Sequence, residues 1–125
     1  MQKNLTEALV VHCIDFRIQG HLNRWIEENL GEGNYDRVAL AGSVLNFDVI
    51  FEQVKTAERL HEIKKVVLIN HEDCGAYGAA GTKERHAADL RAAGEAIVTA
   101  YPHLAVETFY IHLNGSLEPL PNKRG

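Results

Sequence analysis

Short apolar runs alternate along the chain with longer stretches in which apolar residues recur at helical spacing. Short apolar runs bounded by turn residues are typical of strands, and an almost uninterrupted run is typical of a strand covered on both faces. Four such runs predict strands, at residues 7–13, 38–41, 65–70 and 106–113. A last segment, residues 116–120, follows an Asn-Gly pair that is typical of a hairpin turn. The runs therefore predict four main strands and one short closing strand.

The stretches between these runs have the apolar spacing of helices. Three of them predict helices, at residues 21–30, 47–63 and 83–100. Gly31 closes the first helix and Pro102 stops the third. The alternation predicts an α/β fold with a mostly parallel central sheet of about four strands, flanked by helices. The closing segment would be a C-terminal antiparallel edge strand, a position that suits Pro119.

Composition limits the number of domains and the class of partner. A chain of 125 residues with 46% hydrophobic residues is long enough for one domain, which we expect over residues 1–125. Thirteen basic and seventeen acidic residues give a net charge of −4, without the basic stripe that nucleic acid binding requires. The N-terminus is polar, and the apolar run after it is too short for a signal peptide or a membrane span. We therefore expect a cytoplasmic protein whose substrate is a small molecule, without nucleic acid or membrane partners.

Chemically active side chains follow the predicted strands. The first strand ends in HCIDFR, residues 12–17, the second in AGS, and the third in NHEDCGAYG, residues 70–78. Ligands of open α/β sheets gather beyond the carboxyl ends of the strands, so these segments would meet. If residues 12–17 are extended, Cys13, Asp15 and Arg17 project to one side and the two apolar residues between them to the other. A thiol, a carboxylate and a guanidinium would then share a small space.

The first and third segments together contain a set of metal ligands. His71 and Cys74 are three residues apart in a predicted turn, a spacing at which an imidazole and a thiolate bind one metal ion. Cys13 would arrive from the neighbouring strand end. Two thiolates and one imidazole form a zinc site whose fourth position stays open, as in catalytic sites. We therefore expect Zn2+ at this edge of the sheet.

Each of these residues also has a simpler interpretation. Either cysteine alone could be a packed thiol, and Asp15 with Arg17 could be a surface ion pair. The sequence GAYGAAG could be a flexible loop. The remaining histidines form no comparable cluster, and we interpret them as packed, capping or exposed residues: His12, His21, His61, His86, His103 and His112. Only the joint arrangement favours a metal site.

The motif Cys-x-Asp-x-Arg at residues 13–17, followed by His-x-x-Cys-Gly at residues 71–75, resembles the zinc motifs of the β-class carbonic anhydrases. ALAGSV after the second predicted strand and FYIHLNGSLEPL near the end are similar to the same family. Because these segments are spread along the sequence, the resemblance covers most of the chain. It implies that Cys13, His71 and Cys74 bind zinc.

The resemblance also implies an activity. A β-class carbonic anhydrase is a lyase that hydrates carbon dioxide reversibly to bicarbonate through a zinc-bound hydroxide. Asp15 and Arg17 would form the catalytic pair that controls the fourth zinc position, with Asp15 itself the fourth ligand in a closed state. We also expect Gly75 to contact the substrate. Because the family completes its pocket across a subunit interface, the resemblance implies a homodimer or a higher homo-oligomer.

The substrate pocket leaves two alternatives open. The side chains that build the family's carbon dioxide pocket have no match that we identify here, and the segment after Cys74 is shortened. A zinc hydrolase of a related small substrate, carbonyl sulfide or carbon disulfide, would share the nucleophile and differ in the pocket. A non-catalytic zinc-binding or redox-sensing module would keep the metal without turnover.

Overall fold

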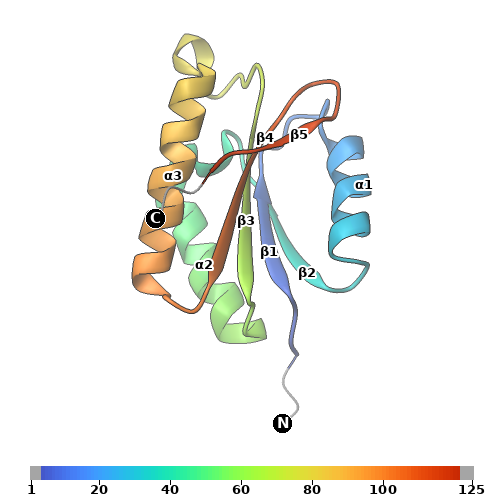
Figure 1. The fold of residues 1–125 in the computed structure, drawn as a ribbon, viewed down its shortest axis with the longest axis vertical. Helices are drawn as coiled ribbons and strands as arrows, with labels where there is room; N and C mark the ends of the chain where they lie inside the picture. Colours follow the sequence, from blue (N-terminus) through green and yellow to red (C-terminus); the bar gives the residue numbers. More distant parts are fainter. Residues whose placement is uncertain (1–3, 122–125) are drawn as a thin grey trace.

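The computed structural model describes residues 4–121, which form one five-stranded sheet with helices on both faces (Figure 1). The strands are β1 (Ala8–His12), β2 (Tyr35–Ala39), β3 (Lys65–His71), β4 (Ala105–Ile111) and β5 (Leu117–Pro119). Their order across the sheet is β2-β1-β3-β4-β5; the pairs β1–β2, β1–β3 and β3–β4 are parallel, and the β4–β5 pair is antiparallel. The structure confirms the predicted α/β class, the mostly parallel sheet and the antiparallel edge strand.

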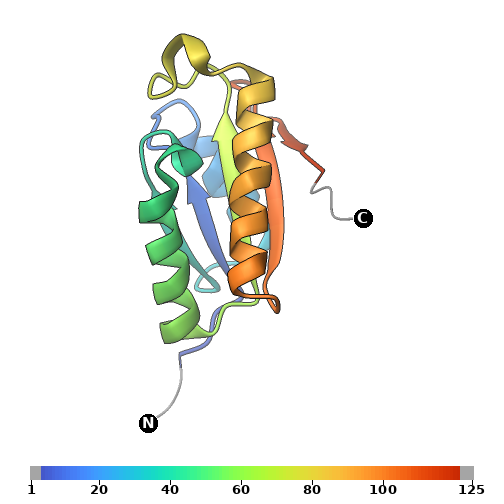
Figure 2. The ribbon, with the colours of Figure 1, turned by 90° about the vertical axis from the view of Figure 1, so that its left-hand side faces the viewer.

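The helices divide unequally between the two faces of the sheet. α1 (Gln19–Asn29) lies on one face, and α2 (Phe47–His61) and α3 (Lys83–Ala100) lie on the other (Figure 1). Figure 2 shows α2 and α3 side by side across their face. Short 3-10 turns, η1 (Ser43–Asn46) and η2 (Gly78–Ala80), precede α2 and α3. Among residues 4–121, no helix has both the length and the apolar character needed to cross a membrane.

The central strands β1 and β3 are almost entirely buried, which explains their nearly uninterrupted apolar sequences. Successive side chains enter opposite layers of the core. Leu9 and Leu68 pack in the layer beneath α2 and α3, whereas Val10 and Ile69 pack in the layer beneath α1. The ends of β1 and β3 are thereby held between two packed layers.

The strand bounds differ from the sequence-based predictions by up to three residues, and β2 differs most. β1 ends at His12, so Cys13 is the first residue of the following loop. β2 begins at Tyr35 and ends at Ala39, earlier than the predicted residues 38–41. It lies at the edge of the sheet, where its residues are only partly buried, and polar residues such as Asp36 weaken the apolar signal.

Candidate metal centre

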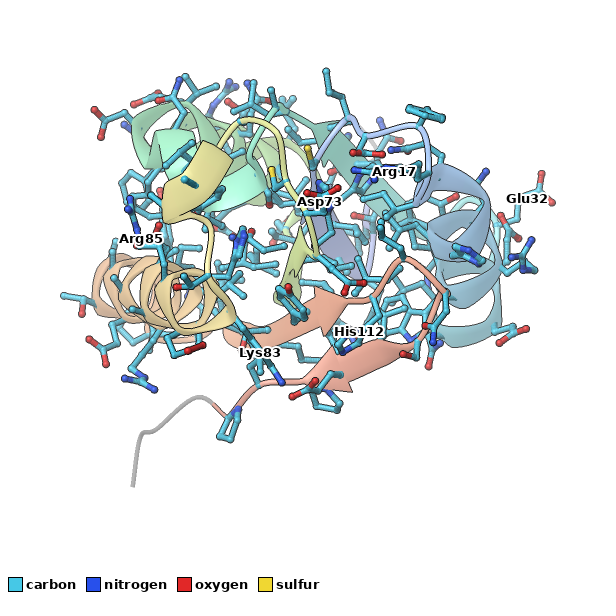
Figure 3. All side chains as sticks on the ribbon, turned by 90° about the horizontal axis from the view of Figure 1, so that it is seen from above. Arg17, Glu32, Asp73, Lys83, Arg85 and His112 are labelled. Atoms are coloured by element: carbon cyan, nitrogen blue, oxygen red, sulfur yellow. The ribbon has the colours of Figure 1, made fainter. Side chains whose placement is uncertain are left out.

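The loops that follow β1 and β3 meet at the carboxyl edge of the sheet. The two strands are parallel neighbours, so the chain leaves both at the same end. Cys13 directly follows β1, His71 is the last residue of β3, and Cys74 lies in the next turn. Figure 3, a view onto this edge, shows Arg17 of the first loop next to Asp73 of the second.

Cys13, His71 and Cys74 form a buried cluster at this point. One potential ligand atom from each residue lies within 4.8 Å of the other two, and the two sulfur atoms are 4.0 Å apart. The exposed fractions are only 5% for each cysteine and 1% for the histidine. The structure therefore brings together the three residues that the sequence singled out, and their role as zinc ligands stays a prediction.

The His71 ring is oriented by the backbone. Its Nδ1 lies 2.7 Å from the carbonyl oxygen of Glu72. Because a carbonyl oxygen can only accept, Nδ1 carries a proton, and in the neutral ring Nε2 carries a free lone pair. That Nε2 is buried and has no hydrogen-bond partner among the described residues. A buried nitrogen without a partner is costly unless it binds a ligand, and an imidazole held in this way by its second nitrogen is typical of metal sites.

The two thiols differ in their surroundings. Burial alone would raise the pKa of Cys13, but the neighbouring His71 imidazole and the backbone N–H of Gly42 outweigh it and lower the pKa to about 7. The Gly42 N–H donates to the Cys13 sulfur at 3.3 Å. Burial raises the pKa of Cys74. Two thiols and one imidazole nitrogen are a donor set that zinc prefers, so the residues present fit the metal that the sequence predicts.

Gly42, the glycine of the AGS segment, allows this close approach. Its φ of 80° is in the left-handed region, and an added Cβ would lie 2.9 Å from Cβ of Leu45 and 3.2 Å from Cβ of Ala76. A larger residue would therefore push apart the turn after β2 and the loop that carries Cys74. The AGS segment contributes a backbone N–H rather than a side chain to the cluster.

Asp15 lies beside the cluster and is held by Arg17. The backbone N and Nε of Arg17 donate to Oδ1 of Asp15 at 2.8 and 3.1 Å, and Nη2 donates to Oδ2 at 2.8 Å. These contacts from Arg17 lower the pKa of Asp15 to about 2, so the carboxylate is ionised at neutral pH. Oδ2 of Asp15 is 4.0 Å from Nε2 of His71. The pair has the two-pronged geometry that the sequence suggested.

Arg17 also reaches the second loop, a contact that was not predicted from the sequence. Its Nη1 donates to Oδ2 of Asp73 at 3.0 Å, and its Nη2 donates to the carbonyl oxygen of Asp73 at 3.0 Å. The φ of Asp73 is 57°, in the left-handed region. A charged residue directly before Cys74 was the only sequence signal of this contact.

The loop after β1 exposes its apolar residues. Ile14 and Phe16 are 59% and 85% exposed, whereas Oδ2 of Asp15 lies 4.0 Å from Nε2 of His71. The segment is not extended throughout as the sequence suggested, because β1 ends at His12 and residues 16–18 form a turn. The side-chain amide of Gln19 donates to the carbonyl oxygens of Cys13 and Asp15 at 3.1 and 2.7 Å. Gln19, at the start of α1, therefore fixes the backbone of this loop, a role that was not predicted from the sequence.

Gly75, the predicted substrate contact, follows Cys74 on the surface. It is exposed, and an added Cβ would meet no atom within 4 Å. Packing therefore does not require a glycine at this position. Its contact with substrate stays a prediction.

A second polar network supports the loop after β3 from the α3 side. The Asn70 amide donates to the hydroxyl of Tyr77 at 3.1 Å and contacts Nδ1 of His86 at 2.8 Å. The Tyr77 hydroxyl donates to Asp89 at 2.8 Å. Asn70, Tyr77 and His86 are buried. His86 is thus a packed residue, as the sequence suggested, but its partners were not foreseen.

Comparison with known proteins finds a matching family and related sequences. The model of a family described as "Putative carbonic anhydrase" matches residues 2–120. An uncharacterized protein of Rickettsia conorii is 32% identical over 139 aligned positions, which cover 94% of this chain and 75% of that protein. A second uncharacterized protein, from Rickettsia bellii, is 28% identical over 94% of this chain and 85% of its own length.

Solved structures share the architecture at low identity. Carbonic anhydrase from Streptococcus mutans matches with a TM-score of 0.62 and 20% identity, over 95% of this chain and 84% of that chain. A β-carbonic anhydrase of Coccomyxa, solved with acetazolamide, matches with a TM-score of 0.61 and 15% identity, over 94% of this chain and 72% of that one. A tetrameric β-carbonic anhydrase of Sordaria macrospora matches with a TM-score of 0.61 and 16% identity, over 94% and 81%. The chain therefore belongs to a carbonic anhydrase-like family and has the fold of the β-carbonic anhydrases.

Proposed function

We propose that this protein is a zinc-dependent carbonic anhydrase that hydrates carbon dioxide reversibly to bicarbonate. The observation that carries the proposal is the buried cluster of Cys13, His71 and Cys74, in which an unpartnered imidazole nitrogen and two thiols lie within 4.8 Å of one another. The ionised carboxylate of Asp15 lies beside it. Membership of a carbonic anhydrase-like family supports this chemistry.

Cys13, His71 and Cys74 would hold the metal. Bound zinc supplies acidification of water and thereby a nucleophile for the carbon of carbon dioxide. His71 offers Nε2 because the Glu72 carbonyl oxygen holds the proton on Nδ1. Two thiolates and a neutral imidazole balance the double charge of the ion. This donor set acidifies water less than neutral ligands would, so we expect activity to rise toward alkaline pH.

Asp15 and Arg17 would control the fourth position. An ionised Asp15 carboxylate can accept a hydrogen bond from the attacking water and so orient its lone pair toward the substrate. The same carboxylate could instead bind the metal and close the site. Arg17 opposes this because it engages both carboxylate oxygens and fixes the plane of the group.

The proposal includes a homodimer or larger assembly in the cytoplasm. The solvent-exposed side chains of Ile14 and Phe16 flank Asp15, and burial of apolar groups of this size favours association. The structurally similar β-carbonic anhydrase of Sordaria macrospora is tetrameric. Cys13 and Cys74 are free thiols, and a reducing compartment keeps ligand thiols available for a metal.

Metal analysis combined with stopped-flow hydration of carbon dioxide tests the proposal. We expect one zinc ion per chain and a hydration rate above that of buffer alone. Release of sulfide from carbonyl sulfide or carbon disulfide, without hydration of carbon dioxide, would show that the protein is a zinc hydrolase of that substrate and not a carbonic anhydrase. Zinc binding without turnover of any of these substrates would instead indicate a non-catalytic zinc module.

A further inference from the structure

We propose that Asp73 is a positioning residue for the metal centre, which holds Arg17 between the two ligand loops and so sets the separation of Cys13 and Cys74. The inference rests on the zinc site proposed above. It assigns to Arg17 a second task besides restraining Asp15.

The contacts of Arg17 divide between the two loops. Nε and Nη2 donate to Asp15 in the loop of Cys13. Nη1 and Nη2 donate to the side chain and the carbonyl oxygen of Asp73, each at 3.0 Å. Because the guanidinium is planar and rigid, contacts at both of its sides fix the two loops relative to each other.

Asp73 transmits this restraint directly to a ligand. It precedes Cys74 in the chain, and its side chain and its backbone carbonyl both accept from Arg17. Its left-handed φ of 57° is a conformation that aspartate, asparagine and glycine adopt more readily than other residues. A displacement of Asp73 relative to Arg17 would therefore displace Cys74 relative to Cys13.

An ordinary surface ion pair would behave differently. The side chain of Asp73 is 74% exposed and that of Arg17 is 34% exposed, so the charge attraction by itself contributes little to stability. Loss of such a pair would leave metal affinity unchanged. Loss of a group that orients metal ligands typically lowers metal affinity about 10- to 100-fold.

A double-mutant cycle on zinc affinity separates these two roles. Asp73→Gly removes the carboxylate, and glycine adopts the left-handed φ without strain. Asp73→Asn keeps a hydrogen-bond acceptor but removes the charge. Each is made in the parent and in an Arg17→Ala background, and zinc affinity is measured by competition with a chromophoric chelator. Glu52→Gln, which breaks an exposed ion pair with Lys55, is the matched control. Circular dichroism and thermal unfolding verify that every variant is folded.

We expect Asp73→Gly to weaken zinc affinity about tenfold in the parent and less than about twofold in the Arg17→Ala background. Asp73→Asn should have an intermediate effect, and Glu52→Gln should have none. Equal losses of zinc affinity in both backgrounds would show that glycine merely loosens the loop. No loss of zinc affinity in either background would show that the contact is an ordinary surface ion pair. Either result overturns the inference. A parent that binds no zinc refutes the site itself, whereas a parent that binds zinc without hydrating carbon dioxide refutes the proposed function and leaves the cycle interpretable.

Discussion

Oδ2 of Asp15 lies 4.0 Å from Nε2 of His71, the nitrogen that we assign to the metal. A metal ion bound by that nitrogen would have the carboxylate at the edge of its coordination sphere. Arg17 holds the same oxygen through Nη2 at 2.8 Å. We therefore propose that Arg17 decides whether Asp15 orients a water molecule or occupies the fourth position.

Replacement of Arg17 by alanine should lower activity without removing the metal. The released Asp15 would bind zinc and close the site, so we expect hydration to fall about 10- to 100-fold while purified protein keeps close to one zinc ion per chain. A crystal structure of the variant should show an Asp15 oxygen about 2.0–2.2 Å from zinc.

Arg17→Lys distinguishes this role from that of an exposed charge. Lysine keeps the charge but lacks the two-pronged geometry, so we expect nearly the same loss of activity as with alanine. A surface ion pair predicts a stability change of roughly 0–1 kcal/mol and unchanged turnover. Parent rates in both variants would refute the gating role.

Replacement of Cys74 by serine tests the ligand assignment. The remaining Cys13 and His71 cannot complete a tetrahedral site, so zinc should be lost during dialysis against a chelator that leaves the parent loaded. Atomic absorption of the two dialysed samples provides the measurement. Stoichiometric zinc in the serine variant would exclude Cys74 as a ligand.

The sequence predicted the position of the candidate site because the site depends on strand ends. β1 and β3 have the apolar runs of buried strands, and parallel neighbours deliver their carboxyl ends to one edge. The placement of Cys13, His71 and Cys74 follows from that topology. The types of these side chains then predicted a shared metal site, and the resemblance to a known family pointed to the same three residues.

The contacts around the ligands could not be predicted in the same way. Arg17 and Asp73 are 56 positions apart, and their contact depends on a left-handed turn that apolar periodicity does not report. Asn70 and His86 meet because β3 ends beside the first turns of α3, a packing detail rather than a pattern. Such contacts require the relative placement of elements, which propensity does not determine.

Removal of the Tyr77 hydroxyl should destabilise the fold. This hydroxyl donates to Asp89 and accepts from Asn70, and Tyr77 is buried. Tyr77→Phe therefore removes one hydrogen bond from each of these two partners. We expect the free energy of unfolding to fall by about 1–3 kcal/mol, measured by urea denaturation. The hydroxyl of Tyr35 is 3.5 Å from Glu27 at the surface, so the control variant Tyr35→Phe should change the free energy of unfolding by less than about 0.5 kcal/mol. Equal effects of the two variants would contradict a structural role for the network.

The contact between Lys83 and Glu118 should make stability depend on acid pH. Lys83 donates to both carboxylate oxygens, and it lowers the pKa of Glu118 together with His112. Because the folded pKa lies below the unfolded value, this contribution is present above the ordinary pKa of glutamate and is lost as pH falls through the folded pKa.

Glu118→Gln should therefore lower the Tm at pH 7, and its difference from the parent should shrink below about pH 4. Differential scanning calorimetry across this range makes the comparison, with the exposed Glu32→Gln as control. A difference that stays constant with pH would show that the carboxylate charge is not responsible.

Assembly should depend on the apolar side chains beside the metal centre. Phe16 is 85% exposed and lies between Asp15 and Arg17 in the chain, so a subunit contact at Phe16 would restrain the loop that carries the pair. We expect light scattering to give a mass of at least twice 13.9 kDa for the parent at micromolar concentration. Phe16→Glu should shift the protein toward the monomer, because burying a carboxylate in an apolar contact is unfavourable.

Leu60→Glu is the matched control for that change, since Leu60 is also an exposed apolar residue but lies in the last turn of α2. It should leave the mass unchanged. Dissociation by Leu60→Glu alone would place the subunit contact elsewhere, and a monomeric parent would refute the assembly. If only Phe16→Glu dissociates the protein, its activity should fall together with its mass, because the loop that carries Asp15 and Arg17 loses the subunit contact that restrains it while the three ligand residues remain in place.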